Sequence, residues 1–182
     1  MYDAILKTVI FGDGGCGKTT LRKRFMTKAY DSRCLKTIGV DFQTKDFELD
    51  GMEVKVMIWD IAGEKRFRYM FPQCLNGVMG GILMYDVTNY SSFSDIPNWL
   101  SLIQETSPRF PIILLGGKLD LDNLREIPRK EGIKVAKSMN LNGFVECSSK
   151  TGENIELVFE VMVRLMLNNM VVNKQVAPSI TT

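Results

Sequence analysis

Residues 12–19, GDGGCGKT, have the residue types and the spacing of a phosphate-binding loop. They fit the pattern G-x-x-x-x-G-K-S/T and lie between an apolar run, Ala4–Phe11, and a segment of helical character, residues 20–28. In such a loop the backbone N–H groups turn toward phosphate oxygens, the lysine reaches the β- and γ-phosphates, and the hydroxyl binds Mg²⁺. A glycine turn with an incidental lysine is the alternative, and the flanking elements argue against it. The residues expected to contact the phosphates are Gly14, Gly15, Cys16, Gly17, Lys18, Thr19 and Thr20.

A second candidate for phosphate chemistry is DIAG, residues 60–63, which begins where a predicted strand over residues 52–60 ends. We expect Asp60 to hold the hydration shell of Mg²⁺ through water, and the backbone N–H of Gly63 to approach a γ-phosphate. Thr37, in an irregular segment between the two motifs, offers another hydroxyl. The tetrapeptide is common by itself, so the prediction depends on its place downstream of the phosphate loop. The predicted metal site is Thr19, Thr37 and Asp60.

Two later segments are candidates for binding the base. GKLD, residues 117–120, and SSK, residues 148–150, each follow a predicted strand, so both are expected at the carboxyl edge of the sheet, where open α/β sheets bind ligands. Asp120 can accept hydrogen bonds from N1–H and the exocyclic amine of guanine, whereas adenine has no such donor pair. Lys118 is expected to cover the ring face. Ser148, Ser149 and Lys150 are expected to offer a backbone N–H to guanine O6.

These residues need a frame of alternating strands and helices. The turn Asp50-Gly51 predicts an antiparallel hairpin, and the later apolar runs are typical of parallel strands buried on both faces. The expected strands are Ala4–Phe11, Val40–Leu49, 52–60, 80–87, 111–118 and 143–147, and the expected helices include 20–28, 91–105, one opened by Ile127-Pro128, and 153–170. We therefore expect a doubly wound α/β domain over residues 1–170, with a six-stranded, mostly parallel sheet, one antiparallel strand and about five helices. Residues 171–182 are expected to form a flexible tail.

The composition excludes several other classes of protein. The 182 residues suit one domain, and a net charge of +2 is too small to argue for a nucleic-acid partner or a membrane surface. The chain has no histidine, which excludes Ser-His-Asp and Cys-His nucleophilic catalysis and HExxH zinc sites. The four cysteines are scattered without metal-binding spacing, as expected in a reducing, cytosolic setting.

Five motifs stand in a characteristic order: GDGGCGKT, TIGVDF (37–42), WDIAG (59–63), GGILMYDVT (80–88) and ECSSKTGENI (146–155). In these motifs, and over residues 5–170, the chain resembles the small GTPases of the Ras superfamily, most of all their Rab branch. The resemblance implies a monomeric P-loop G domain that binds GTP or GDP with Mg²⁺ and meets effector, exchange-factor and GTPase-activating proteins. Thr37 and Gly63 would hold two mobile loops against the γ-phosphate and release them after hydrolysis.

The resemblance also implies roles for individual residues. It places Tyr30 against the guanine. It assigns catalysis to Lys18, Thr37, Gly63 and the residue at position 64. It assigns effector contacts to Ile38, Gly39, Val40, Asp41, Phe42 and Trp59.

Glu64 departs from the family, which usually has a glutamine there to orient the attacking water. Two unit charges about 4 Å apart repel by about 4 kcal/mol at an effective dielectric constant near 20, so a carboxylate beside the γ-phosphate is disfavoured. We expect the loop to swing Glu64 outward, which leaves the water unoriented and hydrolysis slow. The alternative is that the phosphate keeps Glu64 protonated, so that it serves as a proton donor or base.

Other departures affect retention, partners and anchoring. Gly117 stands where the family has an asparagine that touches the base, so we expect weaker nucleotide retention. Cys34 and Cys74 stand where Rab proteins commonly carry tyrosines, so partner specificity is expected to differ. The tail VAPSITT has no CaaX box, paired cysteines or polybasic run, and Tyr2 is not the glycine that myristoylation requires. We expect no direct lipid anchor, a cytoplasmic protein, and membrane recruitment only through a partner.

Three functions are compatible with these patterns. The first is a nucleotide-dependent switch that hydrolyses GTP slowly. The second is a GTP-binding interaction module with negligible hydrolysis, in which Glu64 locks one state. The third is a P-loop kinase or another enzyme that uses ATP. It would need an arginine-bearing lid and a second substrate pocket, for which the chain has little room, and Asp120 argues for guanine.

Overall fold

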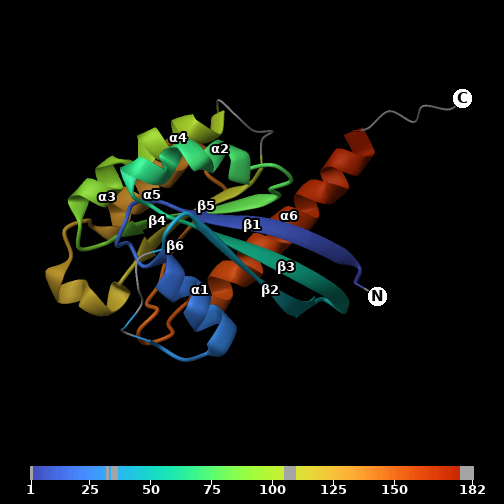
Figure 1. The fold of residues 1–182 in the computed structure, drawn as a ribbon, viewed down its shortest axis with the longest axis horizontal. Helices are drawn as coiled ribbons and strands as arrows, with labels where there is room; N and C mark the ends of the chain where they lie inside the picture. Colours follow the sequence, from blue (N-terminus) through green and yellow to red (C-terminus); the bar gives the residue numbers. More distant parts are fainter. Residues whose placement is uncertain (1, 32, 34–36, 105–109, 177–182) are drawn as a thin grey trace, which may run out of the picture.

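The computed structural model describes residues 2–31, 33, 37–104 and 110–176, which form a six-stranded sheet covered by helices on both faces (Figure 1). The strand order is β2-β3-β1-β4-β5-β6, with β2 antiparallel to β3 and every other neighbouring pair parallel. The strands are β1 (Ala4–Phe11), β2 (Val40–Leu49), β3 (Met52–Ile61), β4 (Gly80–Asp86), β5 (Ile112–Gly117) and β6 (Gly143–Glu146). The predicted α/β fold with one antiparallel strand is confirmed.

The hairpin of β2 and β3 forms because its two turn residues can adopt left-handed backbone angles. Asp50 has φ 52° and Gly51 has φ 79°, as in the turns that match the twist of a two-stranded ribbon. The turn sets a register in which Leu49 faces Met52 and Asp41 faces Asp60. The hairpin therefore places two carboxylates opposite each other at the edge of the sheet where β3 ends.

The described residues contain six α-helices, whereas about five were expected. They are α1 (Lys18–Thr27), α2 (Phe71–Cys74), α3 (Tyr90–Ser94), α4 (Ile96–Gln104), α5 (Arg129–Ser138) and α6 (Ile155–Val176), with two 3₁₀ helices, η1 (Lys65–Met70) and η2 (Leu119–Leu124). The single helix predicted over 91–105 is wrong, because it is divided between α3 and α4. Pro97 has no N–H to donate to the carbonyl of Phe93, so a continuous helix would lose a hydrogen bond there.

Helix α6 also departs from the prediction, because it continues to Val176. The first part of the expected flexible tail is thus helical, and residues 177–182 lie outside the described part of the chain. Residues 171–176, VVNKQV, contain neither glycine nor proline, so each added residue can extend the helix by one hydrogen bond. Among the described helices, none combines the length and the apolar character that a membrane span requires.

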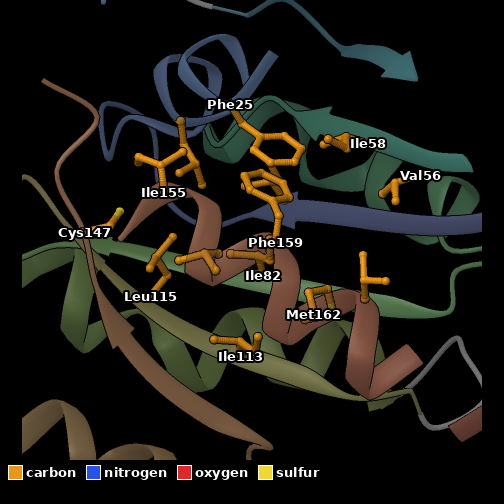
Figure 2. Close-up of a cluster of buried hydrophobic side chains, with 14 of the residues drawn as sticks. Phe25, Val56, Ile58, Ile82, Ile113, Leu115, Cys147, Ile155, Phe159 and Met162 are labelled. Carbon is orange, nitrogen blue, oxygen red and sulfur yellow. The ribbon is translucent and has the colours of Figure 1, made fainter. Parts of the chain in front are cut away.

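Two apolar cores hold the sheet between its helical layers. On one face, α1 and α6 pack on the strands, and the rings of Phe25 and Phe159 stack with centroids 3.8 Å apart (Figure 2). On the other face, α2, α4 and α5 cover a cluster that includes Phe11, Phe71 and Trp99. Because both faces are covered, the carboxyl ends of the parallel strands and the loops after them are left to form a site.

We expect Phe159→Ala to lower the free energy of unfolding by about 3–5 kcal/mol, because it removes a fully packed ring from between α1 and α6. Urea denaturation followed by circular dichroism measures this loss. Leu157→Ala is the matched control, since Leu157 lies on the same helix but is 45% exposed. Equal losses in the two variants would contradict the assignment of Phe159 to the core.

Candidate functional site

The loop of residues 12–17 leaves β1 and enters α1 through close backbone contacts. A Cβ on Gly12 would lie 2.1 Å from the carbonyl oxygen of Met84, so no larger residue fits between the loop and β4. Gly17 caps α1 with φ 99°, a left-handed angle that favours glycine. The loop therefore wraps the N-terminus of α1, whose N–H groups and dipole favour a bound anion.

Lys18 is held under this loop by backbone carbonyls. Its Nζ donates hydrogen bonds to the carbonyl oxygens of Gly12 (2.8 Å) and Asp13 (2.7 Å). The side chain is only 6% exposed, and this burial lowers the pKa of the Lys18 ammonium. A buried ammonium beside a cavity is a strong attractor for phosphate oxygens, because little water screens it.

Three oxygen ligands from separate parts of the chain converge next to Lys18. The Thr19 and Thr37 hydroxyls are 2.6 Å apart, and the Thr37 hydroxyl donates to Asp60 Oδ2 at 3.5 Å. Asp60 is fully buried, and burial raises the pKa of its carboxyl. Its Oδ1 has no hydrogen-bond partner among the described residues.

This arrangement fits the needs of Mg²⁺. The ion prefers oxygen ligands and keeps several of its waters, so two hydroxyls and one carboxylate with an unsatisfied oxygen are a suitable set. No group of three or more His, Cys, Asp or Glu side chains in the described ranges could hold a metal by itself. The residues that would hold a metal here are therefore Thr19, Thr37 and Asp60.

Gly63 brings the end of β3 against the phosphate loop. A Cβ at this position would lie 2.2 Å from the Gly12 carbonyl oxygen and 2.4 Å from Lys18 Nζ, so only glycine permits the approach. The result is a cavity of about 560 Å³. Its lining comprises Asp13, Gly14, Gly15, Gly17, Lys18, Thr19, Thr20, Thr37, Ile61, Ala62, Gly63, Glu64, Lys65 and Arg68.

Glu64 lines the same cavity and is 27% exposed at its side chain. Its Cγ lies 3.5 Å from where a Cβ on Gly14 would be, which places the stem beside the phosphate loop. Its carboxylate accepts a hydrogen bond from Arg66 Nε at 2.7 Å. The side chain thus lies over the loop and does not swing fully outward, while its charge is paired with a cation.

The base-side candidates form a second cluster, at the ends of β5 and β6. The Ser148 hydroxyl donates to Asp120 Oδ1 at 2.6 Å, and Lys118 pairs with Asp86 at 2.6 Å. Ser149 is half-buried and Lys150 is exposed. These residues do not line the phosphate-side cavity. The two clusters meet at the loop, because a Cβ on Gly117 would lie 3.2 Å from the carbonyl oxygen of Cys16.

The expected partner-facing residues present an exposed apolar surface at the start of β2. Ile38 is 80% exposed and Phe42 is 54% exposed, and the Phe42 ring stacks on Trp59 at 5.4 Å between centroids. Cys74 is buried among core residues, so it does not extend this aromatic pair, and Cys34 lies outside the described residues. Gly39 and Val40, which are also expected to face partners, are half-buried. Tyr30, which is expected against the guanine, is exposed.

Sequence analysis missed a network that ties the loop to α4. Asp13 Oδ1 accepts hydrogen bonds from Trp99 Nε1 and Arg68 Nη2, both at 2.8 Å. The Arg68 guanidinium also pairs with Asp95 and lies 4.4 Å from the Trp99 ring centroid. Burial raises the pKa of Asp13. These residues are far apart in sequence and follow no short motif, so no local signal could have grouped them.

The comparisons with known proteins agree with this site. The model of the Ras family matches residues 7–168. The chain is 40% identical over 164 residues to Ras-related protein Rab-8A of Gallus gallus, covering 90% of this chain and 79% of that protein. It is 40% identical over 164 residues to Ras-related protein Rab-18-B of Danio rerio, covering 89% and 79%. Ras-related protein Rab-8B of Homo sapiens is 38% identical over 164 residues, with coverage of 90% and 79%. The chain therefore belongs to the Ras family, and it is a Rab-like small GTPase.

Proposed function

We propose that this GTPase is a molecular switch that binds GTP and GDP together with Mg²⁺ and hydrolyses GTP slowly. The observation that carries the proposal is the convergence of the Thr19 and Thr37 hydroxyls with Asp60 beside the cavity that Lys18 and Gly63 line. The two hydroxyls come from different segments of the chain and meet beside a fully buried carboxylate. Their meeting point suits a metal-bound phosphate.

Each residue has a defined task in this proposal. Lys18 neutralises charge on the β- and γ-phosphates, and the Gly63 N–H donates to a γ-phosphate oxygen. Thr19, Thr37 and Asp60 hold the metal, directly or through water. Bound Mg²⁺ supplies further neutralisation of the charge that builds up on the phosphate oxygens.

The switching element in this proposal is the pair of loops that carry Thr37 and Gly63. The loops touch through a hydrogen bond from the Ala62 N–H to the Gly39 carbonyl oxygen at 2.9 Å. Loss of the γ-phosphate removes a ligand from both loops at once, so both are released together. The exposed residues Ile38 and Phe42 lie next to the first loop, where effectors would detect the change.

Slow hydrolysis follows from the place of Glu64. An ionised carboxylate can only accept hydrogen bonds, whereas a glutamine amide both donates and accepts, so Glu64, with one oxygen held by Arg66 Nε, does not orient the attacking water as an amide does. The pairing also reduces the repulsion between Glu64 and a γ-phosphate, which allows GTP to bind. The alternative function, an interaction module with negligible hydrolysis, rests on the same residue.

We expect Glu64→Gln to accelerate single-turnover GTP hydrolysis on the order of 10- to 100-fold, because the amide can both donate to and accept from the attacking water. Chromatography of bound nucleotide over several hours measures the conversion of GTP to GDP. The unchanged protein should convert its GTP completely, at a rate no faster than on the order of 10⁻⁴ s⁻¹.

Glu64→Ala is the matched control, because it removes the carboxylate without supplying an amide. It should remain as slow as the unchanged protein. An alanine variant as fast as the glutamine variant would show that repulsion, and not orientation of the water, limits the rate. No GDP after many hours in the unchanged protein would favour the interaction module.

We propose guanine as the base because Asp120 accepts hydrogen bonds and lies within reach of Ser148 at the carboxyl edge of the sheet. A large excess of ATP should leave fluorescent GDP bound, whereas unlabelled GTP should displace it, because adenine has no donor pair for the carboxylate. Fluorescence during competition measures the displacement. Efficient displacement by ATP would overturn the guanine assignment and favour an enzyme that uses ATP.

Weak retention of the nucleotide is expected because position 117 carries glycine in place of the asparagine that touches the base. The packing beneath Gly117 shows why an asparagine does not fit there without a further change. Met84 Cε lies 2.3 Å from where a Cβ on Gly117 would be, and 3.5 Å from where one on Gly17 would be. The thioether therefore fills the room that an asparagine side chain at position 117 would require. Met84 and Gly117 act as a matched pair, one large and one small.

We expect Gly117→Asn alone to leave GDP release nearly unchanged, because the end of the Met84 side chain must first turn aside to admit the new side chain. Together with Met84→Val, which frees the room and keeps a residue suited to a strand, Gly117→Asn should slow release about tenfold relative to Met84→Val alone. Stopped-flow release of fluorescent GDP from the four proteins of this cycle measures the coupling. If the effects of Met84→Val and Gly117→Asn on the rate of GDP release simply add, the two residues are not coupled.

A further inference from the structure

Arg22 is a buried cation that none of the nucleotide-binding motifs includes. It lies on α1, one turn after Lys18, and its side chain is 2% exposed. Its Nη2 donates to Asp41 Oδ2 at 2.5 Å, and its Nε lies 3.7 Å from Asp60 Oδ2. Neither Nε nor Nη1 has a hydrogen-bond partner among the described residues. A buried guanidinium is costly unless acids compensate it, so its position needs a reason.

The register of the hairpin supplies that reason. Asp41 on β2 and Asp60 on β3 are cross-strand partners, and like charges directly opposite each other destabilise a sheet. Helix α1 brings Arg22 to both carboxylates, where it offsets their repulsion. Asp41 is 56% exposed and can also be compensated by water, whereas Asp60 is fully buried. Asp60 therefore depends more strongly on the guanidinium.

We propose that Arg22 is a built-in cation at the metal side of the site, which weakens Mg²⁺ binding and makes nucleotide retention less dependent on Mg²⁺. This inference rests on the proposed metal site of Thr19, Thr37 and Asp60. Part of the charge of Asp60 is already neutralised by Arg22, so it attracts a divalent ion less strongly. When Mg²⁺ leaves, the guanidinium stays and still limits the repulsion between Asp60 and the phosphates.

Asp41 sets how much of the guanidinium is available to Asp60. The hydrogen bond from Nη2 pairs the guanidinium with Asp41, at the exposed start of β2. This pairing leaves less of the positive charge of Arg22 to act on Asp60. If Asp41 loses its charge, Arg22 acts on Asp60 alone and opposes Mg²⁺ more strongly. Arg22 thus connects Asp41, on the expected partner-facing surface, to Asp60 at the proposed metal site.

The test is the Mg²⁺ dependence of fluorescent GDP release, measured from chelator-buffered micromolar to millimolar free Mg²⁺. In Arg22→Met, which keeps the length of the side chain without its charge, the Mg²⁺ concentration for half-maximal slowing should fall about tenfold. Excess chelator should accelerate release more in this variant than in the unchanged protein. Lys23→Met is the matched control, because it removes a charge from the same helix at a residue with no contact to Asp60, and it should behave as the unchanged protein.

Asp41→Asn keeps the inference testable if Arg22→Met does not fold, since it changes only an exposed carboxylate. It should by itself move the half-maximal Mg²⁺ concentration upward. Where Arg22→Met does fold, the upward shift should disappear in the double variant. Identical Mg²⁺ dependence in Arg22→Met and the unchanged protein would overturn the role of Arg22. If the rate of GDP release does not depend on Mg²⁺ in any of these proteins, the proposed metal site is wrong, and this inference is wrong with it.

Discussion

The site depends on backbone segments that approach one another more closely than side chains would permit. The phosphate loop lies directly against β4 at Gly12, and the end of β3 lies directly against the loop at Gly63. Because a Cβ at either position would come within about 2.2 Å of a carbonyl oxygen, these contacts exist only between glycine and main chain. Their effect is to gather donors from several strands around one cavity and to position Lys18 beneath it.

This close packing concentrates charge in a place that little water reaches. Lys18, Arg22 and Asp60 are all nearly or fully buried, and all lie on or beside α1. Buried charges are retained in proteins when they pair or bind ligands, and each of these has an acid, a carbonyl group or a proposed metal to compensate it. Because little water screens these buried charges, they act strongly on one another. Replacing one of the charged side chains therefore has a large effect on the electrostatic energy of the site.

The sequence predicted the fold class and the positions of the strands along the chain well, because these follow from short-range patterns. Apolar runs gave the parallel strands, and Asp50-Gly51 identified the hairpin. The bounds of helices were predicted less well. The break between α3 and α4 depends on Pro97 inside an otherwise helical pattern, and the extension of α6 to Val176 depends on residues without an amphipathic signal.

The sequence by itself determined which residue types are available for phosphate, metal and base, because a phosphate loop and its glycines must occur in a contiguous motif. Only the tertiary structure decided which charges meet. Arg68 reaches Asp13 across 55 positions of sequence, and Arg22 reaches Asp41 and Asp60 because a strand register and a helix face coincide. Such pairs leave no local pattern, since their energy comes from burial at a place that exists only when the sheet and its helices have packed.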